Sequence, residues 1–355
     1  LDLRTPIVSD QGLRRSHPFL VAEIADAHDI NPADSVEDFD ALIWPHLGRI
    51  LGAAARALFM GLTGSLGATV PTGTARRHRQ RTSRYCAAFT LAGEASLLPK
   101  GETDGPIGAA SLARMLKLAL NARPVLLTPT DCVDPLAAAL QAYGVEADIL
   151  TMAGGNDPTE ARNQAARWID ALQPGAMVAI ELKGAAPDGN LYYMTGRECV
   201  FDARLDQAFL VAGERGIPTV GVGDGGNEVG FGPYLSAVAK AHPNGAVIGS
   251  TVATDTLVVA AVSNWGCCGL EAMIAFLTGR PELMHSNAEA IAGLESCAAA
   301  GSVDGIYLIP APMEAGQPAA IHIALMALMR HVVQNGLQTV KYALDVPKQT
   351  EAGRR

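Results

Sequence analysis

The sequence GVGDGGNEVGFG at residues 221–232 decides how this chain is expected to fold. It follows the apolar run IPTV at residues 217–220, which is typical of a buried strand. Six glycines in twelve residues let the backbone turn sharply and approach a ligand closely. Asp224, Asn227 and Glu228 place three oxygen-bearing side chains in the same loop. Open α/β sheets bind ligands in such loops at the carboxyl ends of strands, and a tight turn with solvated acids is the alternative.

The rest of the chain repeats a pattern of strand, loop and helix. Strands are expected at residues 125–129, 145–150, 176–182, 217–222 and 246–250, and helices at 109–120, 133–143, 158–172, 202–215 and 268–277. This alternation predicts an α/β fold with a mostly parallel sheet and helices on both faces. Helical N-terminal and C-terminal additions complete it. The expected divisions are a helical extension at 1–66, a catalytic domain at 67–340 and a polar tail at 341–355.

Composition narrows the class of protein. The chain has 355 residues, 49% of them hydrophobic, which is enough for a substantial core. Its formal net charge of -9 argues against nucleic acid as a partner. No stretch is apolar for long enough to suggest a membrane partner, and the first residues show no signal-peptide pattern. We therefore expect a cytoplasmic protein acting on a small molecule, with a homo-oligomer left open.

The cysteines and histidines show no recognised metal-binding spacing. The six cysteines form no CxxC pair, so buried free thiols are expected, and the adjacent Cys267 and Cys268 are not expected to hold one metal together. The eight histidines are scattered, and most are expected at the surface or at helix ends. Zinc is accordingly disfavoured.

Further polar residues stand where elements begin or end. Asp104 lies in GETDGPIGA at residues 101–109, before an expected helix, as a cap or a metal ligand. Glu181 ends an expected strand, and a solvated strand end is its alternative. Asp255 follows the strand expected at 246–250. Asn264 is expected either to orient a substrate or to satisfy backbone groups at a helix start.

These oxygen-bearing side chains are expected to converge on one crevice. The set is Asp104, Glu181, Asp224, Asn227, Glu228 and Asp255. Hard oxygen ligands of this kind suit Mg²⁺ or Mn²⁺. The basic run RRHRQRTSR at 76–84 is either a solvated loop or an arm that attracts an anion.

Four blocks of this chain resemble the D-glutamate cyclase family. They are GETDGPIGAASLARML, ELKGAAPDGNLYYMTGR, GVGDGGNEVGFG and ATDTLVVAAVSNWGCCGL, and they occur in the family's order over residues 68–280. The resemblance implies an α/β enzyme that converts D-glutamate to 5-oxo-D-proline and water. Archaeal relatives point to manganese, so Mn²⁺ is favoured over Mg²⁺ as cofactor, and vertebrate relatives are mitochondrial. The doubled cysteine after Gly266 departs from the family's pattern, in which small or aromatic residues are common.

The resemblance and the chemistry of the residues together suggest roles. Asp224, Glu228 and Asp255 are predicted to hold the metal, with Asp104 or Glu181 contributing. Glu181 is the first choice for moving a proton, and Asp104 and Asn264 complete the catalytic set. Substrate binding is assigned to Asn227 and to the backbone amides of Gly105, Gly108, Gly225 and Gly226.

Two other classes of function fit the same acids. A Mn²⁺-dependent phosphatase or other phosphoester hydrolase would use the acidic crevice, with the arginine run drawing phosphate. A non-catalytic binding protein would hold an amino acid or nucleotide without turnover. A nicotinamide dehydrogenase is disfavoured, because residues 221–232 carry acids where a dinucleotide loop presents bare backbone to a pyrophosphate.

Overall fold

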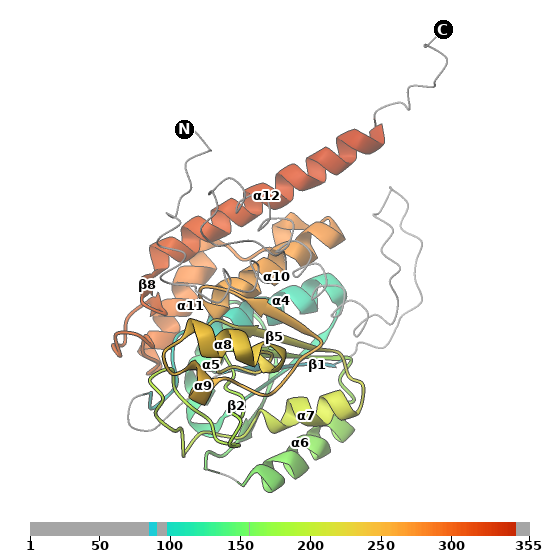
Figure 1. Ribbon diagram of the computed structural model, residues 1–355. Coiled ribbons are helices and arrows are strands. Elements are labelled where there is room, and N and C mark those ends of the chain that lie inside the picture. The colour runs from blue at the N-terminus through green and yellow to red at the C-terminus, as the bar shows by residue number, and fades with distance from the viewer. Residues whose placement is uncertain (1–84, 91–97, 156, 346–355) are drawn as a thin grey trace.

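The computed structural model describes residues 85–90, 98–155 and 157–345. Within them one sheet holds six parallel strands in the order β3-β2-β1-β4-β5-β6 (Figure 1). The strands are β1 (Tyr85–Thr90), β2 (Arg123–Pro129), β3 (Asp148–Met152), β4 (Ala176–Ile180), β5 (Thr219–Gly223) and β6 (Thr256–Val259). The predicted α/β fold with a parallel sheet is confirmed.

Helices cover both faces of this sheet. They are α4 (Pro106–Leu120), α5 (Val133–Ala142), α6 (Pro158–Leu172), α7 (Gln207–Glu214), α8 (Leu235–Ala241), α9 (Gly245–Ile248), α10 (Ser263–Thr278), α11 (Asn287–Ala299) and α12 (Ala319–Asp345). Short 3₁₀ turns lie at Thr130–Cys132, Gly232–Tyr234 and Pro281–Leu283, and a small hairpin joins β7 (Met313–Glu314) to β8 (Gln317–Pro318).

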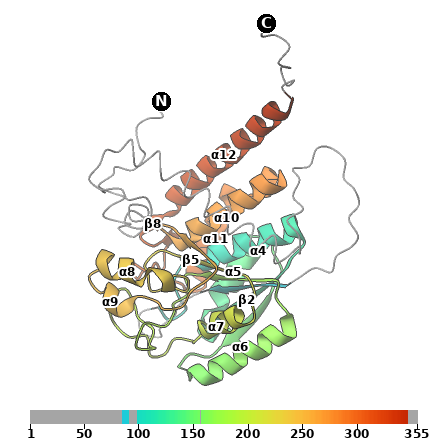
Figure 2. The ribbon, with the colours of Figure 1, turned by 45° about the vertical axis from the view of Figure 1, so that its right-hand side comes forward.

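Each face of the sheet has its own hydrophobic core. On one face the sheet packs against α4, α5 and α10, which α11 and α12 cover as a further layer, and on the other against α6 and α7 (Figure 2). Strand β4 feeds both cores, because successive side chains of a strand point to opposite faces. Val178 and Ile180 join the first core, whereas Met177 and Ala179 join the second. All five residues of β4 are buried, as expected of a central parallel strand.

Local sequence explains where the outer helix α6 starts. The Asp157 carboxylate accepts hydrogen bonds from the backbone N–H of Thr159 at 2.7 Å and of Glu160 at 3.3 Å. Pro158 occupies the first turn, where its missing N–H costs nothing. The predicted helix at residues 158–172 is confirmed at both ends.

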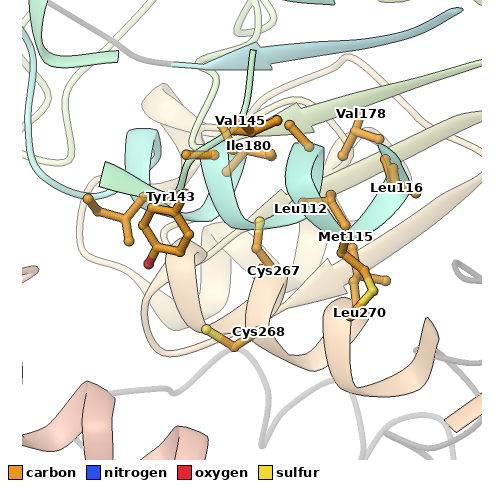
Figure 3. Packing of buried hydrophobic residues seen from close by; sticks show 14 of the residues in the cluster. Leu112, Met115, Leu116, Tyr143, Val145, Val178, Ile180, Cys267, Cys268 and Leu270 are labelled. Atoms are coloured by element: carbon orange, nitrogen blue, oxygen red, sulfur yellow. The ribbon is translucent and has the colours of Figure 1, made fainter. Parts of the chain in front are cut away.

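The close approach of α4 and α10 depends on a glycine. A Cβ atom at Gly108 would lie 2.8 Å from the Cys267 Sγ atom, too close for unshifted packing. Figure 3 shows Cys267 directed from α10 toward α4, where Leu112 and Met115 lie. The two helices therefore run side by side with their N-terminal turns in contact.

Some predicted elements are wrong or shifted. Residues 246–250 do not form a strand, because Gly245–Ile248 is a helical turn in which Val247 and Ile248 donate to the Asn244 carbonyl oxygen at 2.8 and 3.0 Å. The last strand of the six-stranded sheet is β6, which lies in the next apolar run. A short apolar run is compatible with a strand or a helix, so the pattern does not distinguish the two. Helix α10 begins at Ser263 rather than 268, and α7 at Gln207 rather than 202.

The predicted divisions at the chain ends can be compared with the structure only in part. Helix α12 continues to Asp345, past the expected boundary at 340. The extension at 1–66 and the basic run at 76–84 lie outside the described residues. Among the helices that are described, none combines the length and apolarity needed to cross a bilayer.

Leu112 on α4 provides a test of this packing. It is 1% exposed in the first core, so Leu112→Ala is expected to lower the free energy of unfolding by about 2–5 kcal/mol. Leu118→Ala, on the same helix but 45% exposed, is the matched control and should cost within about 0.5 kcal/mol. Urea denaturation measures both. Equal losses in the two variants would contradict the placement of α4.

Candidate active site

The sheet has one point at which the order of its strands reverses. From β1 the chain proceeds outward through β2 to β3, and from β4 it proceeds the other way through β5 to β6. Ligands of open α/β sheets bind outside the carboxyl ends of the strands at this switch point. Glu181 directly follows β4, and Asp224 directly follows β5. Both predicted acids therefore lie at the edge where a site is expected.

Two helices that start at this edge cap one another. The Asp104 carboxylate accepts from the backbone N–H of Asn264 at 2.7 Å and of Ser263 at 2.8 Å, at the start of α10. In return, the Asn264 Oδ1 atom accepts from the N–H of Gly105 at 2.9 Å and of Gly108 at 2.7 Å, at the start of α4. Each residue satisfies amides that a helix start leaves without partners. Asp104 and Asn264 thus hold the two N-termini together.

Three carboxylates meet beside these helix starts. One oxygen of each of Asp104, Glu181 and Asp224 lies within 4.8 Å of the others. Burial raises the pKa of Asp104 well above its usual range, and the charge of Glu314 raises it further. Burial also raises the pKa of Glu181, with Asp224 as the next cause, and the pKa of Asp224, with Glu228 as the next cause. The cluster concentrates more negative charge than burial tolerates without a cation or protons.

Glu181 is held in a sparsely populated backbone conformation. Its φ angle is 50°, which is unusual for a residue other than glycine. Its backbone N–H donates to the Val222 carbonyl oxygen at 3.0 Å, and its Oε2 atom accepts from the Ser263 hydroxyl at 2.5 Å. These contacts hold the carboxylate toward the cluster. Backbone strain of about 1–3 kcal/mol persists at positions that surrounding structure enforces, commonly at active sites.

The glycine-rich loop after β5 is braced by its own glutamate. Glu228 accepts from the N–H of Gly225 at 3.0 Å and of Gly226 at 2.7 Å. Gly226 has a φ of 101°, which a residue with a side chain rarely adopts. The Asn227 amide donates to the Tyr192 carbonyl oxygen at 2.8 Å. Its Oδ1 atom is buried and has no hydrogen-bond partner among the residues that the structure describes.

A lysine and a further acid border the cluster. Lys183 pairs with Asp202 at 3.0 Å and lies 4.3 Å from the centroid of the Tyr193 ring. The pKa of Lys183 is raised despite burial, chiefly by the charge of Asp202, so its ammonium group stays charged. Burial raises the pKa of Glu102 to about 7, while Lys183 opposes that shift. Both residues lie in blocks that the sequence analysis quotes, but neither was predicted as a site residue.

The structure does not bring every predicted residue to this point. Asp255 precedes β6, and its Oδ2 atom accepts from the N–H of Thr219 at 2.8 Å, at the beginning of β5. It lies at the amino ends of the strands opposite Thr219, five residues or about 17 Å along β5 from Asp224. The expectation failed because β6 begins after Asp255, whereas a strand had been predicted before it.

Four backbone amides that were predicted to bind substrate donate hydrogen bonds to other residues of the protein. The amides of Gly105 and Gly108 donate to Asn264, and those of Gly225 and Gly226 donate to Glu228. These amides therefore brace the site instead of facing a substrate carboxylate. Glu228 likewise acts on its own loop, and it is not part of the group of three acids. Ser263, which sequence reasoning missed, holds Glu181.

The acidic cluster fits a hard divalent cation. Its three donors are carboxylate oxygens, which Mg²⁺ and Mn²⁺ prefer, and they come from three separate elements. A cation there would offset the charge that burial otherwise disfavours. The fold and site together define a doubly wound α/β protein with an acidic, metal-compatible site at its switch point.

Comparison with known proteins identifies the family. The sequence profile described as D-glutamate cyclase-like, C-terminal, matches residues 80–330. The chain therefore belongs to the D-glutamate cyclase-like family. A second profile, acyl-CoA dehydrogenase, C-terminal, bacterial type, matches residues 14–101, most of which lie outside the described part of the chain.

Individual relatives cover less of the chain. The mitochondrial D-glutamate cyclase of Homo sapiens is 37% identical over 185 residues, which are 47% of this chain and 29% of that protein. This chain thus matches less than a third of its relative's length. A solved S. aureus MnaA-UDP co-structure shares 14% identity over 40% of this chain and 31% of its own, with a TM-score of 0.26. A similarity this slight carries no functional weight.

The raised pKa values of the cluster predict how stability depends on pH. Ordinary values are 3.8 for Asp and 4.5 for Glu, and the values of Asp104, Glu181 and Asp224 are higher in the folded chain. Above about pH 4 the folded state therefore binds more protons than the unfolded state, so the metal-free protein should lose stability as pH rises. Thermal melts from about pH 5 to about pH 8 measure this.

Added Mn²⁺ should counter that loss, because deprotonation exposes the ligands that bind it. Asp224→Asn removes one titrating acid and should flatten both the pH dependence and the Mn²⁺ effect. The difference between wild type and this variant isolates the cluster from other titrating groups. A melt that responds equally to Mn²⁺ in both proteins would contradict the assignment.

Proposed function

We propose that this protein is a D-glutamate cyclase, which closes D-glutamate to 5-oxo-D-proline and water with a divalent metal ion, Mn²⁺ in preference to Mg²⁺. The observation that carries the proposal is the convergence of Asp104, Glu181 and Asp224 at the switch point of the sheet. Membership of the D-glutamate cyclase-like family and the human relative support the choice of reaction.

The reaction joins two ends of one molecule. The α-amine nitrogen attacks the γ-carboxyl carbon, a C–N bond forms, and a C–O bond breaks. Two protons leave the ammonium nitrogen and both end in the released water, so no net proton is consumed. Because the step is intramolecular, much of the catalysis is to fold the substrate into the attacking geometry.

The residues of the site would bind the metal ion, transfer a proton and bind the substrate ammonium group. Asp104 and Asp224 would hold the metal ion, which when bound supplies a Lewis acid for the γ-carboxylate. Glu181 has one oxygen engaged by the Ser263 hydroxyl, which leaves the other to take a proton from the amine and return it to the departing oxygen. The buried Asn227 Oδ1 atom, which has no hydrogen-bond partner among the described residues, would accept a hydrogen bond from the substrate ammonium group.

A direct assay tests the proposed reaction. The purified chain is incubated with D-glutamate and with L-glutamate, each with and without Mn²⁺, and chiral chromatography follows 5-oxoproline. We expect 5-oxo-D-proline from D-glutamate only, and only with the metal. A generic phosphoester in parallel tests the hydrolase alternative. Phosphate release without any 5-oxoproline would reject the cyclase.

Paired aspartate variants locate the metal site. Asp224→Asn should lose Mn²⁺ binding and at least about a hundredfold in turnover, because it removes a charged ligand from the cluster. Asp255→Asn is the matched control, since that residue serves the opposite edge of the sheet through Thr219. It should keep its turnover and bound Mn²⁺. Metal content and the cyclase assay are measured for both variants. Loss of Mn²⁺ and turnover in Asp255→Asn but not in Asp224→Asn would make Asp255 a metal ligand in place of Asp224.

A further inference from the structure

A second group of possible metal ligands is buried behind the acidic site. Cys268 comes from α10, His285 from the segment before α11, and His322 from α12. One ligand atom of each lies within 4.8 Å of the others, and all three side chains are 0–1% exposed. No element of the proposed cyclase reaction uses them.

Carboxylates fix both imidazole rings. His322 Nδ1 lies 2.7 Å from Glu314 Oε1, and His285 Nδ1 lies 2.6 Å from Glu271 Oε2. Glu314 also accepts from the Asn264 amide at 2.8 Å and from the Trp265 indole, and Glu271 from the His285 backbone N–H at 2.6 Å. Because these carboxylates accept hydrogen bonds, each Nδ1 carries a proton. Histidines that ligate metals are held in this way.

The other two ring nitrogens then face each other. His285 Nε2 and His322 Nε2 are 3.1 Å apart, and Cys268 Sγ lies 3.7 Å from His322 Nε2. With a proton on each Nδ1, a neutral imidazole presents only a lone pair at Nε2. Two lone pairs at this distance repel unless a positive charge lies between them.

The spacing of the ligand atoms fits a tetrahedral zinc ion. Zinc binds nitrogen at about 2.0–2.1 Å and thiolate sulfur at about 2.3 Å, so tetrahedral geometry places nitrogen ligands about 3.3 Å apart and sulfur about 3.6 Å from nitrogen. The observed distances are 3.1 and 3.7 Å. A sulfur and two imidazoles also favour zinc over Mg²⁺ or Mn²⁺.

We propose that Cys268, His285 and His322 bind one Zn²⁺ ion at a buried site separate from the acidic cluster. The Cys268 side chain is 1% exposed, and its thiol would lose its proton to the surroundings when the metal binds. The ion offsets two of the three negative charges carried by the Cys268 thiolate and the carboxylates of Glu271 and Glu314.

A tyrosine supplies an independent sign of a missing partner. The Tyr143 side chain is 1% exposed, and its hydroxyl has no hydrogen-bond partner among the described residues. Its ring packs edge-on against His285, with centroids 5.3 Å apart. Figure 3 shows the hydroxyl directed to the side of α10 on which the Cys268 sulfur lies. A water in the fourth position on zinc would give this hydroxyl a partner.

Metal analysis of the purified full chain tests the proposal without any activity assay. We expect about one zinc per chain. Cys268→Ser should lose that zinc and lower the melting temperature by at least about 5 °C. Cys297→Ser is the matched control, because Cys297 is also fully buried but donates to the Pro135 carbonyl oxygen, which a serine can still do. It should keep its zinc.

A second measurement covers a Cys268→Ser variant that fails to fold. Wild-type protein is stripped with a chelator and reloaded with Co²⁺, and a thiolate-to-cobalt charge-transfer band is expected in its absorption spectrum. Asp224→Asn should show the same band, because that residue belongs to the acidic cluster. The proposal is overturned if stripped protein takes up neither zinc nor cobalt, or if Cys268→Ser retains wild-type zinc. Failure of the cyclase assay would leave these readouts unchanged.

Discussion

The reciprocal capping of α4 and α10 is the interaction on which the site depends. Asp104 stands before α4 yet caps α10, and Asn264 stands in the first turn of α10 yet caps α4. Both side chains are buried, so each amide they satisfy would otherwise lose water without a replacement. The exchange fixes how far one helix start lies from the other. It also places Asp104, with its charge, at the carboxyl edge of the sheet.

Several energetically unfavourable features lie next to the reciprocally capped helix starts. Three carboxylates are gathered at buried or half-buried positions, and Glu181 keeps a positive φ angle. Buried like charges and strained backbone both oppose folding. Rules of local structure are commonly broken where function requires it. Here the exceptions coincide at the switch point, which is stronger support for a site than any of them alone.

Sequence reasoning reached the layout of the sheet and part of the site, for identifiable reasons. Glu181 and Asp224 were found because each follows an apolar strand, and a strand's carboxyl end is readable from its pattern. Asp255 was misplaced because the run at 246–250 was taken for the strand that actually begins at Thr256. The glycine amides were correctly located at turns, but their partners, Asn264 and Glu228, are set by tertiary contacts.

The cluster of buried histidines could not be predicted from the sequence, for a different reason. His322 lies 54 positions after Cys268 and 37 after His285, so no short ligand spacing connects the three residues. The packing of α12 against α10 brings His322 to Cys268, and hydrogen bonds to Glu271 of α10 bring His285 there.

That packing also links the two clusters. Glu314 binds His322 on one side and the Asn264 amide on the other, and Asn264 in turn meets Asp104. The thiol and imidazoles suit a softer ion, and the carboxylates suit a harder one, so each cluster discriminates against the other's metal. With zinc bound as proposed, His322 holds Glu314 in place, and Glu314 orients the asparagine that joins the two helix starts. The zinc site would then affect the acidic site only by fixing the positions of Glu314 and Asn264, and through them the position of Asp104.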